Sequence, residues 1–435
     1  MDLTIEGKAF INGSFQQSCI GIKNGKIVSI KKNLKADTHH TFGNRLILPA
    51  GIDIHVHFRD PGYVHKEDFK TGSKSAIFGG IGCIFDMPNT NPATTTKKAL
   101  IQKINNAKNK TYTDFGLYAG ISTNNLEYIT DLSQFCSGFK IFLGNTTNSL
   151  NFPSDALSTA FQKTSTTNKP IFIHAEEEKC LEKNKIIENN LKDHLLSRPS
   201  LCEQKAILNV LQQSNPYNTP IHICHLSSCE GFEVLRNKRK NISVGVTPHH
   251  LLFDIDSVTS LQSLYKVNPP IRSHFDKETL WYGVTNNLID VIESDHAPHT
   301  FEEKNVDFDL APSGIAGVET MYPLFLAKVK QGYMSMNTLI SLLCERPAKI
   351  MNLSKGKIEV GNDADFIVID YKKITKINAE NLHSKCNWTC YEGFPAIFPG
   401  VVYLGGKKIV DDFQLVEKPG VGRHVLSNIE NSVSI

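Results

Sequence analysis

Eight short apolar runs, separated by longer stretches with helical periodicity, occupy the middle of this 435-residue chain. Helical patterns lie between the runs, for example at 66–78, 97–108, 203–213 and 230–240. Strand–helix alternation favours a parallel sheet, and eight such units over about 250–300 residues are typical of a closed barrel. We therefore predict an α/β fold whose main domain, residues 51–353, is a (β/α)8 TIM-type barrel. The predicted strands are 52–56, 83–87, 115–120, 139–143, 170–173, 221–224, 242–246 and 289–292.

Short, glycine-broken pieces with strand-like alternation occur at both ends of the chain, at 3–48 and again at 356–404. Chain termini often lie close together on a domain surface, so two such ends can pair around a long insertion. We predict that residues 1–50 and 354–435 together form a second domain, a small β-sandwich.

Charge and cysteine usage exclude several classes of protein. The chain has 47 basic and 44 acidic residues, a net charge of +3, which favours neither nucleic acid nor an anionic membrane as a partner. Ten cysteines without a Cys-x-x-Cys pair predict reduced thiols rather than a disulfide framework. The start shows no signal pattern, and no apolar run reaches the ~18 residues of a membrane span. We expect a cytoplasmic protein that acts on a small molecule.

Residue types that bind metals follow several of the predicted strands. His55 and His57 alternate at the end of the first run, and because side chains two apart in a strand share a face, their imidazoles can bind one metal ion. His174 follows the fifth run, His225 the sixth and Asp295 the eighth. A barrel brings these strand ends together, so the five residues predict a metal site there.

Lys140 lies inside the fourth apolar run, where an unpaired ammonium group would be costly to bury. Three interpretations stay open from the residues alone. The side chain extends to the rim of the barrel, it pairs with Asp295, or it reacts with CO₂ to form a carbamate, an anionic ligand able to bridge two cations.

Three segments around these residues resemble the dihydroorotases of the amidohydrolase superfamily: His-Val-His-Phe-Arg-Asp-Pro-Gly at 55–62, Asp-Met-Pro-Asn-Thr at 86–90 and Ser-Asp-His-Ala-Pro-His at 294–299. The similarity covers nearly the whole chain. Single pieces recur across the superfamily, so the combination is the specific signal. Further matches lie at 172–176, 222–225, 246–250, 266–270, 313–314 and 363–365.

The resemblance implies the reversible hydrolysis of the cyclic amide of (S)-dihydroorotate to N-carbamoyl-L-aspartate, a step of de novo pyrimidine biosynthesis, by a hydroxide that two zinc ions activate. It implies two Zn²⁺ per chain bridged by N6-carboxylated Lys140. The simplest bacterial members carry aspartate at that position, and this chain looks like the members with the modified lysine. The implied metal ligands are His55, His57 and Asp295 for one ion and His174 and His225 for the other, with Lys140 between them.

Proton transfer and substrate binding follow from the same resemblance. Asp295 is the implied catalytic residue, which takes a proton from the attacking water and returns it to the ring nitrogen. Arg59 offers a planar fork for the substrate carboxylate, a group that hydantoins, dihydropyrimidines and allantoin lack. The polar loop 144–149 resembles the family's loop over the substrate. The implied substrate-binding residues are His57, Arg59, Asn89, Thr146, Asn268, His299, Ser313 and Gly314.

Two other functions stay open at this point. Allantoinase or another cyclic-amide hydrolase would share the metal ligands, but Arg59 together with Asn89 argues against it. A non-catalytic assembly relative would have lost ligands, whereas all six ligand positions are filled here. The sequence leaves open the native metal, the direction of flux, the carboxylation of Lys140, and whether the chain forms a homodimer or binds a transcarbamoylase partner.

Overall fold

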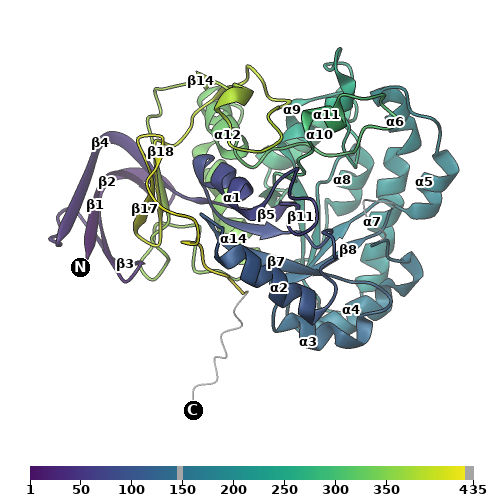
Figure 1. The fold of residues 1–435 in the computed structure, drawn as a ribbon, viewed down its shortest axis with the longest axis horizontal. Coiled ribbons are helices and arrows are strands. Elements are labelled where there is room, and N and C mark those ends of the chain that lie inside the picture. The colour runs from purple at the N-terminus through teal and green to yellow at the C-terminus, as the bar shows by residue number, and fades with distance from the viewer. Residues whose placement is uncertain (145–149, 427–435) are drawn as a thin grey trace.

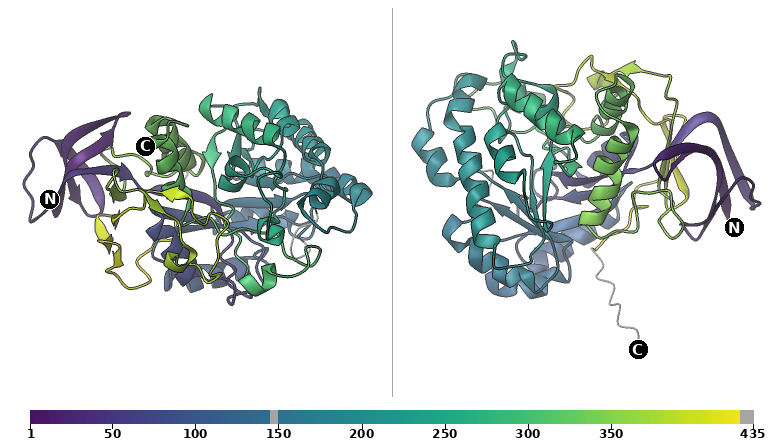
Figure 2. Two further views of the ribbon diagram at one scale, coloured as in Figure 1. Left: turned by 90° about the horizontal axis from the view of Figure 1, so that it is seen from above. Right: turned by 180° about the vertical axis from the view of Figure 1, so that it is seen from behind.

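The structure, a computed structural model, describes residues 1–144 and 150–426 (Figure 1). A barrel with its surrounding helices forms most of the molecule, and a second sheet lies beside it, with the N-terminus on the side away from the barrel (Figures 1 and 2). Within the two described ranges, no helix is long and apolar enough to cross a membrane.

The barrel consists, within the described residues, of eight parallel strands that neighbour one another in chain order. Nearly every strand residue is buried, as expected for strands whose two faces are both covered. The barrel predicted from the sequence is confirmed. Its strands are β5 (Gly51–Val56), β6 (Ile81–Asp86), β7 (Asp114–Gly120), β8 (Gly138–Phe142), β9 (Ile171–His174), β10 (Ile221–Ile223), β11 (Ile242–Val246) and β12 (Val291–Ile292).

The sheet closes between β5 and the residues that follow β12. The amide N–H of His57 donates to the carbonyl oxygen of His296 at 2.8 Å. Oδ1 of the buried Asp53 accepts the amide N–H of Ser294 at 3.2 Å. The closure therefore brings the end of the first barrel strand against the loop that carries Asp295.

Helices surround the barrel (Figure 1). They are α1 (Phe69–Phe78), α2 (Lys97–Lys108), η1 (Leu126–Tyr128), α3 (Ile129–Ser133), η2 (Ser154–Ala156), α4 (Leu157–Ser165), α5 (Glu178–Asn184), α6 (Leu191–Ser197), α7 (Ser200–Ser214), α8 (Cys229–Leu235), α9 (Pro248–Leu252), η3 (Gln262–Tyr265), α10 (His274–Thr285), α11 (Phe301–Lys304), α12 (Met321–Lys330), α13 (Met336–Ile340), η4 (Ser341–Glu345), α14 (Arg346–Ile350) and η5 (Ala379–Asn381). The predicted helices correspond to α1, α2, α7 and α8. α1 begins later than predicted because Asp68 and Thr71 form a capping box.

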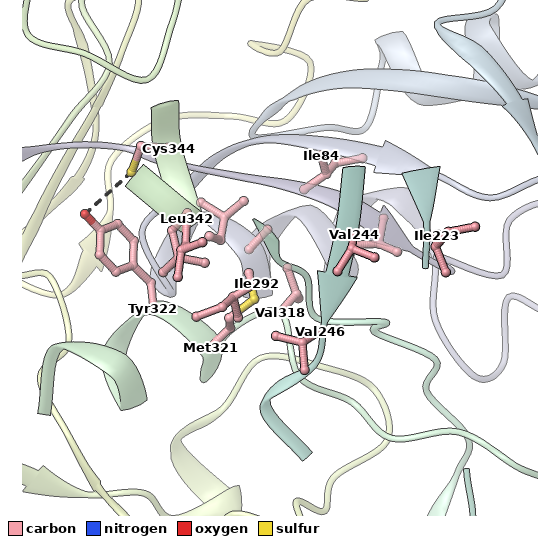
Figure 3. Close-up of a cluster of buried hydrophobic side chains, with 14 of the residues drawn as sticks. Ile84, Ile223, Val244, Val246, Ile292, Val318, Met321, Tyr322, Leu342 and Cys344 are labelled. Atoms are coloured by element: carbon pink, nitrogen blue, oxygen red, sulfur yellow. Dashed lines mark hydrogen bonds between the residues drawn. The ribbon is translucent and has the colours of Figure 1, made fainter. Parts of the chain in front are cut away.

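Many apolar side chains of the strands and helices belong to one large core cluster (Figure 3). Val244 of β11 belongs to it together with Met321 and Tyr322 of α12 and Leu342 of η4. Burial of such apolar surface is the main favourable contribution to folding. The hydroxyl of Tyr322 also donates to the carbonyl oxygen of Pro49 at 3.2 Å, which ties α12 to the point where the chain enters the barrel.

The two chain ends form a mixed sheet whose described strands run in the order β18-β17-β16-β13-β4-β1-β2-β3. β4 is parallel to β1 and antiparallel to β13, so it joins the two ends. The prediction that both chain ends build a separate β structure is confirmed, with the strands hydrogen-bonded in one mixed sheet and apolar residues of both ends in a shared core. The strands outside the barrel are β1 (Leu3–Ile11), β2 (Ser14–Lys23), β3 (Lys26–Lys31), β4 (Thr38–Pro49), β13 (Phe366–Ile369), β14 (Thr375–Lys376), β15 (Pro395–Ala396), β16 (Val401–Leu404), β17 (Lys407–Asp411) and β18 (Gln414–Leu415).

Two C-terminal stretches pack on the barrel instead of extending this sheet. The first lies between β14 and β15, where the indole N–H of Trp388 donates to the carbonyl oxygen of His299 at 2.7 Å. The second, at 423–425, lies along β7 through two backbone hydrogen bonds with Phe115. The domain boundaries at 50/51 and 353/354 stay predictions.

All ten cysteines lie in the described ranges, and two of them are paired. Cys180 of α5 and Cys202 of α7 form a disulfide, with their Cα atoms 5.4 Å apart. The expectation of reduced thiols is wrong for this pair and holds for the other eight cysteines. The pairing arises because the chain after β9 turns back on the start of α7, where the amide N–H of Glu177 donates to the carbonyl oxygen of Cys202 at 3.0 Å.

A buried lysine, Lys355, connects the barrel with the second sheet. Its Nζ lies 2.7 Å from Asp114, 2.8 Å from Asp363 and 2.5 Å from Asp365. Arg423 adds contacts of 2.8 Å to Asp114 and 2.7 Å to Asp363. Asp114 begins β7 and Asp365 precedes β13, so the cations hold the two sheets together.

Lys355→Met should lower the free energy of unfolding by about 3–5 kcal/mol, because three buried carboxylates lose the cation that they share. Lys357→Met is the matched control, since this lysine is exposed, and it should change the free energy of unfolding by less than ~0.5 kcal/mol. Denaturant titration of both variants measures the difference. Equal stability of the two would show that the cluster does not hold the sheets together.

Candidate active site

The C-terminal end of the barrel holds an open cavity of about 180 Å³. Its wall contains most of the residues that the sequence analysis singled out. His299 lies behind Arg59, outside the wall, and Thr146 lies outside the described residues. The predicted residues in the wall are His55, His57, Arg59, Asn89, Lys140, His174, His225, Asn268, Asp295, Ser313 and Gly314.

One group of potential metal ligands comes from the closure of the barrel. His55 lies within β5 and His57 directly follows its last residue, so both side chains face Asp295. Oδ1 of Asp295 lies 3.3 Å from Nε2 of His55 and 3.1 Å from Nε2 of His57. Two nitrogens and one carboxylate oxygen therefore converge on one point in a buried place, which is the arrangement that a metal ion requires.

A second group lies opposite, at the ends of β9 and β10. His174 is the last residue of β9, and His225 lies two residues after β10. Nδ1 of His174 and Nε2 of His225 are 3.1 Å apart, and both side chains are buried. His225 has φ +39°, a left-handed conformation that aims its ring toward His174.

In three of the histidines, a polar group contacts the ring nitrogen that does not face the proposed metal. Nδ1 of His57 donates to Oδ1 of Asn89 at 2.7 Å, and Nε2 of His174 donates to Glu176 at 2.8 Å. Nδ1 of His55 lies 3.4 Å from Glu293, a contact that is electrostatic rather than a hydrogen bond. The other nitrogen of each ring then presents its lone pair to the cavity, as metal-binding histidines do.

Electrostatics favour the neutral form of these rings. Burial lowers the pKa of His55 to about 4, lowers the pKa values of His57 and His174, and takes that of His225 well below its usual range. Burial alone would raise the pKa of Asp295, but His55 and His57 outweigh it and hold this pKa below its usual value. Neutral imidazoles beside an ionised carboxylate are metal-binding forms, so the donor set fits a metal.

Lys140 is fully buried at the centre of this group. Its Nζ lies 3.2 Å from Sγ of Cys224 and 4.9 Å from the centre of the Phe142 ring. Among the described residues it forms no ion pair with any carboxylate. The side chain neither extends to the rim nor pairs with Asp295 in the described chain.

Arg59 is held on the opposite wall by the loop after β5. It has φ +62°, and the amide N–H of the preceding Phe58 donates to Oδ1 of Asp86 at 2.7 Å. Asp86 is in turn paired with the buried Lys103 at 2.5 Å. Burial lowers the pKa of Arg59 to about 10, so the guanidinium stays charged at neutral pH.

Asn268, Ser313 and Gly314 form the remaining polar wall. The hydroxyl of Ser313 donates to Oδ1 of Asn268 at 3.2 Å. The amide N–H of Gly314 donates to the carbonyl oxygen of Lys266 at 2.9 Å and is therefore already used. Gly314 has φ +148°, and a Cβ there would collide with the carbonyl oxygen of Ala297, so only glycine fits.

The sequence analysis missed the groups that orient the ligands. Glu176 lies in a quoted motif but had no role, and Arg198, which binds it through Nε at 3.1 Å, was not noticed. Glu293 is fully buried and accepts the amide N–H of His225 at 2.6 Å. It occupies the space that a side chain at Gly245 would fill. The sequence did offer a signal for both glutamates, since Glu176 lies two residues after His174 and Glu293 lies two residues before Asp295.

Known proteins are similar to this chain in sequence and fold. Residues 46–394 match the model of the Amidohydrolase family. A dihydroorotase from Methanosarcina acetivorans is 35% identical and covers 95% of this chain and 93% of its own length. A dihydroorotase from Thermoplasma volcanium is 38% identical over 98% of each chain. Among solved structures, the L-hydantoinase (dihydropyrimidinase) from Arthrobacter aurescens has a TM-score of 0.94 at 26% identity, covering 98% of this chain and 99% of that one.

Glu176→Gln should weaken metal binding by about 10- to 100-fold, because the amide no longer orients His174 with a negative charge. Glu182→Gln, an exposed position on α5, is the control and should leave the affinity unchanged. Competition between each variant and a chromophoric chelator measures the affinity. If the two variants bind metal equally well, Glu176 does not support the ligand.

Proposed function

The chain belongs to the amidohydrolase family and within it to the dihydroorotases, and from this premise we propose the reaction and the roles of its residues. The reaction is the reversible hydrolysis of the cyclic amide of (S)-dihydroorotate to N-carbamoyl-L-aspartate. It is a step of de novo pyrimidine biosynthesis, which we assign to the cytoplasm. A homodimer and a transcarbamoylase partner stay predictions.

The choice of substrate rests on the surroundings of the guanidinium group of Arg59. This group is buried, and among the described residues it forms no ion pair with a carboxylate. Its contacts are the carbonyl oxygen of Pro298 at 3.2 Å and Nε2 of His299 at 3.2 Å. A buried cation without an anion is costly. The carboxylate of dihydroorotate supplies that anion at the edge of the cavity that holds the metal ligands.

Two Zn²⁺ ions are the metals that we propose for the two ligand groups. His55, His57 and Asp295 would hold one, and His174 and His225 the other. The nitrogen and oxygen donors match the preference of zinc. When bound, a pair of such ions lowers the pKa of a shared water toward ~7 and polarises the amide carbonyl of the substrate.

Lys140 serves, in this proposal, as the N6-carboxylated bridge between the two ligand groups. Its neutral amine reacts with CO₂, the new N–C bond forms and one proton leaves, which gives an anionic carbamate. The support is its burial beside a thiol and an aromatic ring, without a carboxylate in the described chain. A carbamate removes the buried positive charge and adds two oxygen ligands.

Asp295 is the proposed catalytic residue. Its carboxylate is ionised because its pKa lies below the usual value, so it can accept the proton of the attacking water. It then returns the proton to the ring nitrogen that leaves. Proton transfer of this kind contributes about 10²- to 10⁴-fold to the rate.

The other polar residues bind the substrate. Because Oδ1 of Asn89 accepts from His57, its amide N–H groups are left to donate to the substrate carboxylate beside Arg59. Asn268 and the backbone at Ser313 and Gly314 border the ring. Thr146 is proposed as a further contact by resemblance alone.

A neutral cyclic amide, as in an allantoinase or a hydantoinase, is the weaker alternative. The solved hydantoinase has the same fold, but a neutral substrate leaves Arg59 without an anion. A non-catalytic relative is disfavoured because all six proposed metal ligands line one cavity.

Lys140→Ala should lose bound metal and activity together, because the bridging ligand is missing. Small carboxylic acids that fit the space of the lost side chain should restore part of both. Metal analysis and a dihydroorotate assay, with and without added acid, measure the two effects. Full metal content and undiminished turnover without acid would refute the bridging role.

Arg59→Met should keep the metals and lower kcat/KM for dihydroorotate by the equivalent of about 1.5–3 kcal/mol, the contribution of a charged hydrogen bond. Neutral cyclic amides such as dihydrouracil should be affected little. Asp295→Ala is the contrasting variant and should abolish turnover of every substrate. An equal loss for charged and neutral substrates in Arg59→Met would contradict the carboxylate assignment and favour the neutral substrates.

A further inference from the structure

Four polar groups surround the ring of His299, which is buried behind Arg59. Nδ1 lies 3.0 Å from Nζ of Lys66 and 3.5 Å from a carboxylate oxygen of Glu303. Nε2 lies 3.2 Å from Nη2 of Arg59 and 3.2 Å from the carbonyl oxygen of Ser313. Each ring nitrogen thus has one donor and one acceptor beside it, and two tautomers compete.

The distances on the Nδ1 side decide between the tautomers. Lys66 and Arg59 can both only donate, and a neutral imidazole accepts at one nitrogen only. Lys66 lies 3.0 Å from Nδ1, nearer than Arg59 lies to Nε2, and of the two nitrogens only Nε2 has an acceptor at 3.2 Å, the carbonyl oxygen of Ser313. The carboxylate of Glu303 at 3.5 Å is too far for a normal hydrogen bond from Nδ1. Burial keeps the ring neutral, with a pKa lowered to about 3. The single ring proton therefore lies on Nε2.

This tautomer changes what Arg59 and His299 offer to a ligand. The N–H of Arg59 and Nε2–H of His299 are both donors, and they face each other at 3.2 Å with the carbonyl oxygen of Ser313 as an acceptor for one of them. An anionic oxygen placed beside both would accept from Arg59, and it would compete with the carbonyl oxygen of Ser313 for the N–H of His299. In the other tautomer Arg59 would donate to Nε2, and His299 would offer no donor to an anion.

We propose that Lys66 is a positioning residue for anion selectivity, which by donating to Nδ1 holds His299 as an Nε2–H donor beside Arg59 toward the substrate carboxylate. The proposal rests on the proposed function and deepens it, because it adds a selecting residue that does not itself touch the substrate.

Lys66 is well placed for this role. It lies in the loop between β5 and α1, the same loop that carries Arg59, and its side chain is 16% exposed. Nζ is also 3.1 Å from Glu303, whose other oxygen accepts the amide N–H of Thr300 at 3.1 Å in the capping box of α11. The ammonium group is therefore anchored by the helix that follows His299, and one of its other two N–H groups can donate to Nδ1 of His299.

The kinetic test compares Lys66→Met with Lys70→Met, a control that removes the same charge from an exposed position on α1. Lys66→Met should lower kcat/KM for dihydroorotate by about tenfold or more, mainly through KM, and change that for dihydrouracil less than about twofold. Lys66→Arg keeps a donor at Nδ1 and should recover most of the loss. Equal losses for the two substrates, or a loss matched by Lys70→Met, would overturn the proposal.

Nitrogen-15 NMR of the histidine rings tests the tautomer directly, with the His299→Gln spectrum identifying the signal. In the metal-loaded wild type Nε2 should give the protonated, pyrrole-type shift and Nδ1 the unprotonated one. In Lys66→Met the two shifts should move toward each other or exchange, because Nδ1 is then free to donate to Glu303. A protonated Nδ1 in the wild type, or no change in Lys66→Met, would refute the proposal.

The two experiments separate this inference from the proposed function. A wild-type protein that does not turn over dihydroorotate would refute the proposed function. The NMR result depends on the substrate-free protein alone. It therefore shows whether Lys66 sets the tautomer of His299, whether or not the protein turns over dihydroorotate.

Discussion

The closure of the barrel between its first and last strands is the constraint on which the site depends. β12 has only two residues, so backbone pairing at this junction is short. Oδ1 of the buried Asp53 compensates by accepting the amide N–H of His55 at 3.1 Å and that of Ser294 at 3.2 Å. A slip of one residue would turn His55 and His57 to the other face of the sheet. The register that closes the barrel is therefore the register that brings the histidines to Asp295.

Buried cations in this molecule fall into two kinds. Lys103 pairs with Asp86 at 2.5 Å, and Lys304 donates to two backbone carbonyl oxygens at 2.9 and 3.1 Å. Their partners belong to the fold. Lys140 has a thiol and a ring, and Arg59 has a carbonyl and an imidazole, with no carboxylate ion pair for either in the described chain. Lys140 and Arg59 therefore carry unbalanced charge at the cavity itself, where the proposed carbamate and substrate would supply the anions.

The sequence predicted the parts of the structure that follow a local period. Apolar runs identified the barrel strands, and the alternation of His55 and His57 identified the face of the first strand that carries metal-ligand residues. The orienting groups leave no such period, because Arg198 reaches Glu176 from a loop 22 residues away and Glu293 acts from the opposite side of the closure. For the same reason the positions of the two C-terminal stretches on the barrel were beyond prediction. Each depends on tertiary contacts that no window of sequence contains.

The C-terminal stretch between β14 and β15 shows why the chain returns to the barrel between two strands of the second sheet, β13 and β16. The indole of Trp388 donates to the carbonyl oxygen of His299 at 2.7 Å, and the hydroxyl of Ser384 donates to Glu67 at 2.6 Å. Lys385 donates to the carbonyl oxygen of Val64 at 2.8 Å. One segment therefore braces both the loop after β5, which carries Arg59, and the loop after β12, which carries His299. Loops that bind substrate lose precision unless other residues hold them. The two loops that we propose to bind the substrate carboxylate are therefore held by one segment, and the second sheet anchors that segment at both ends.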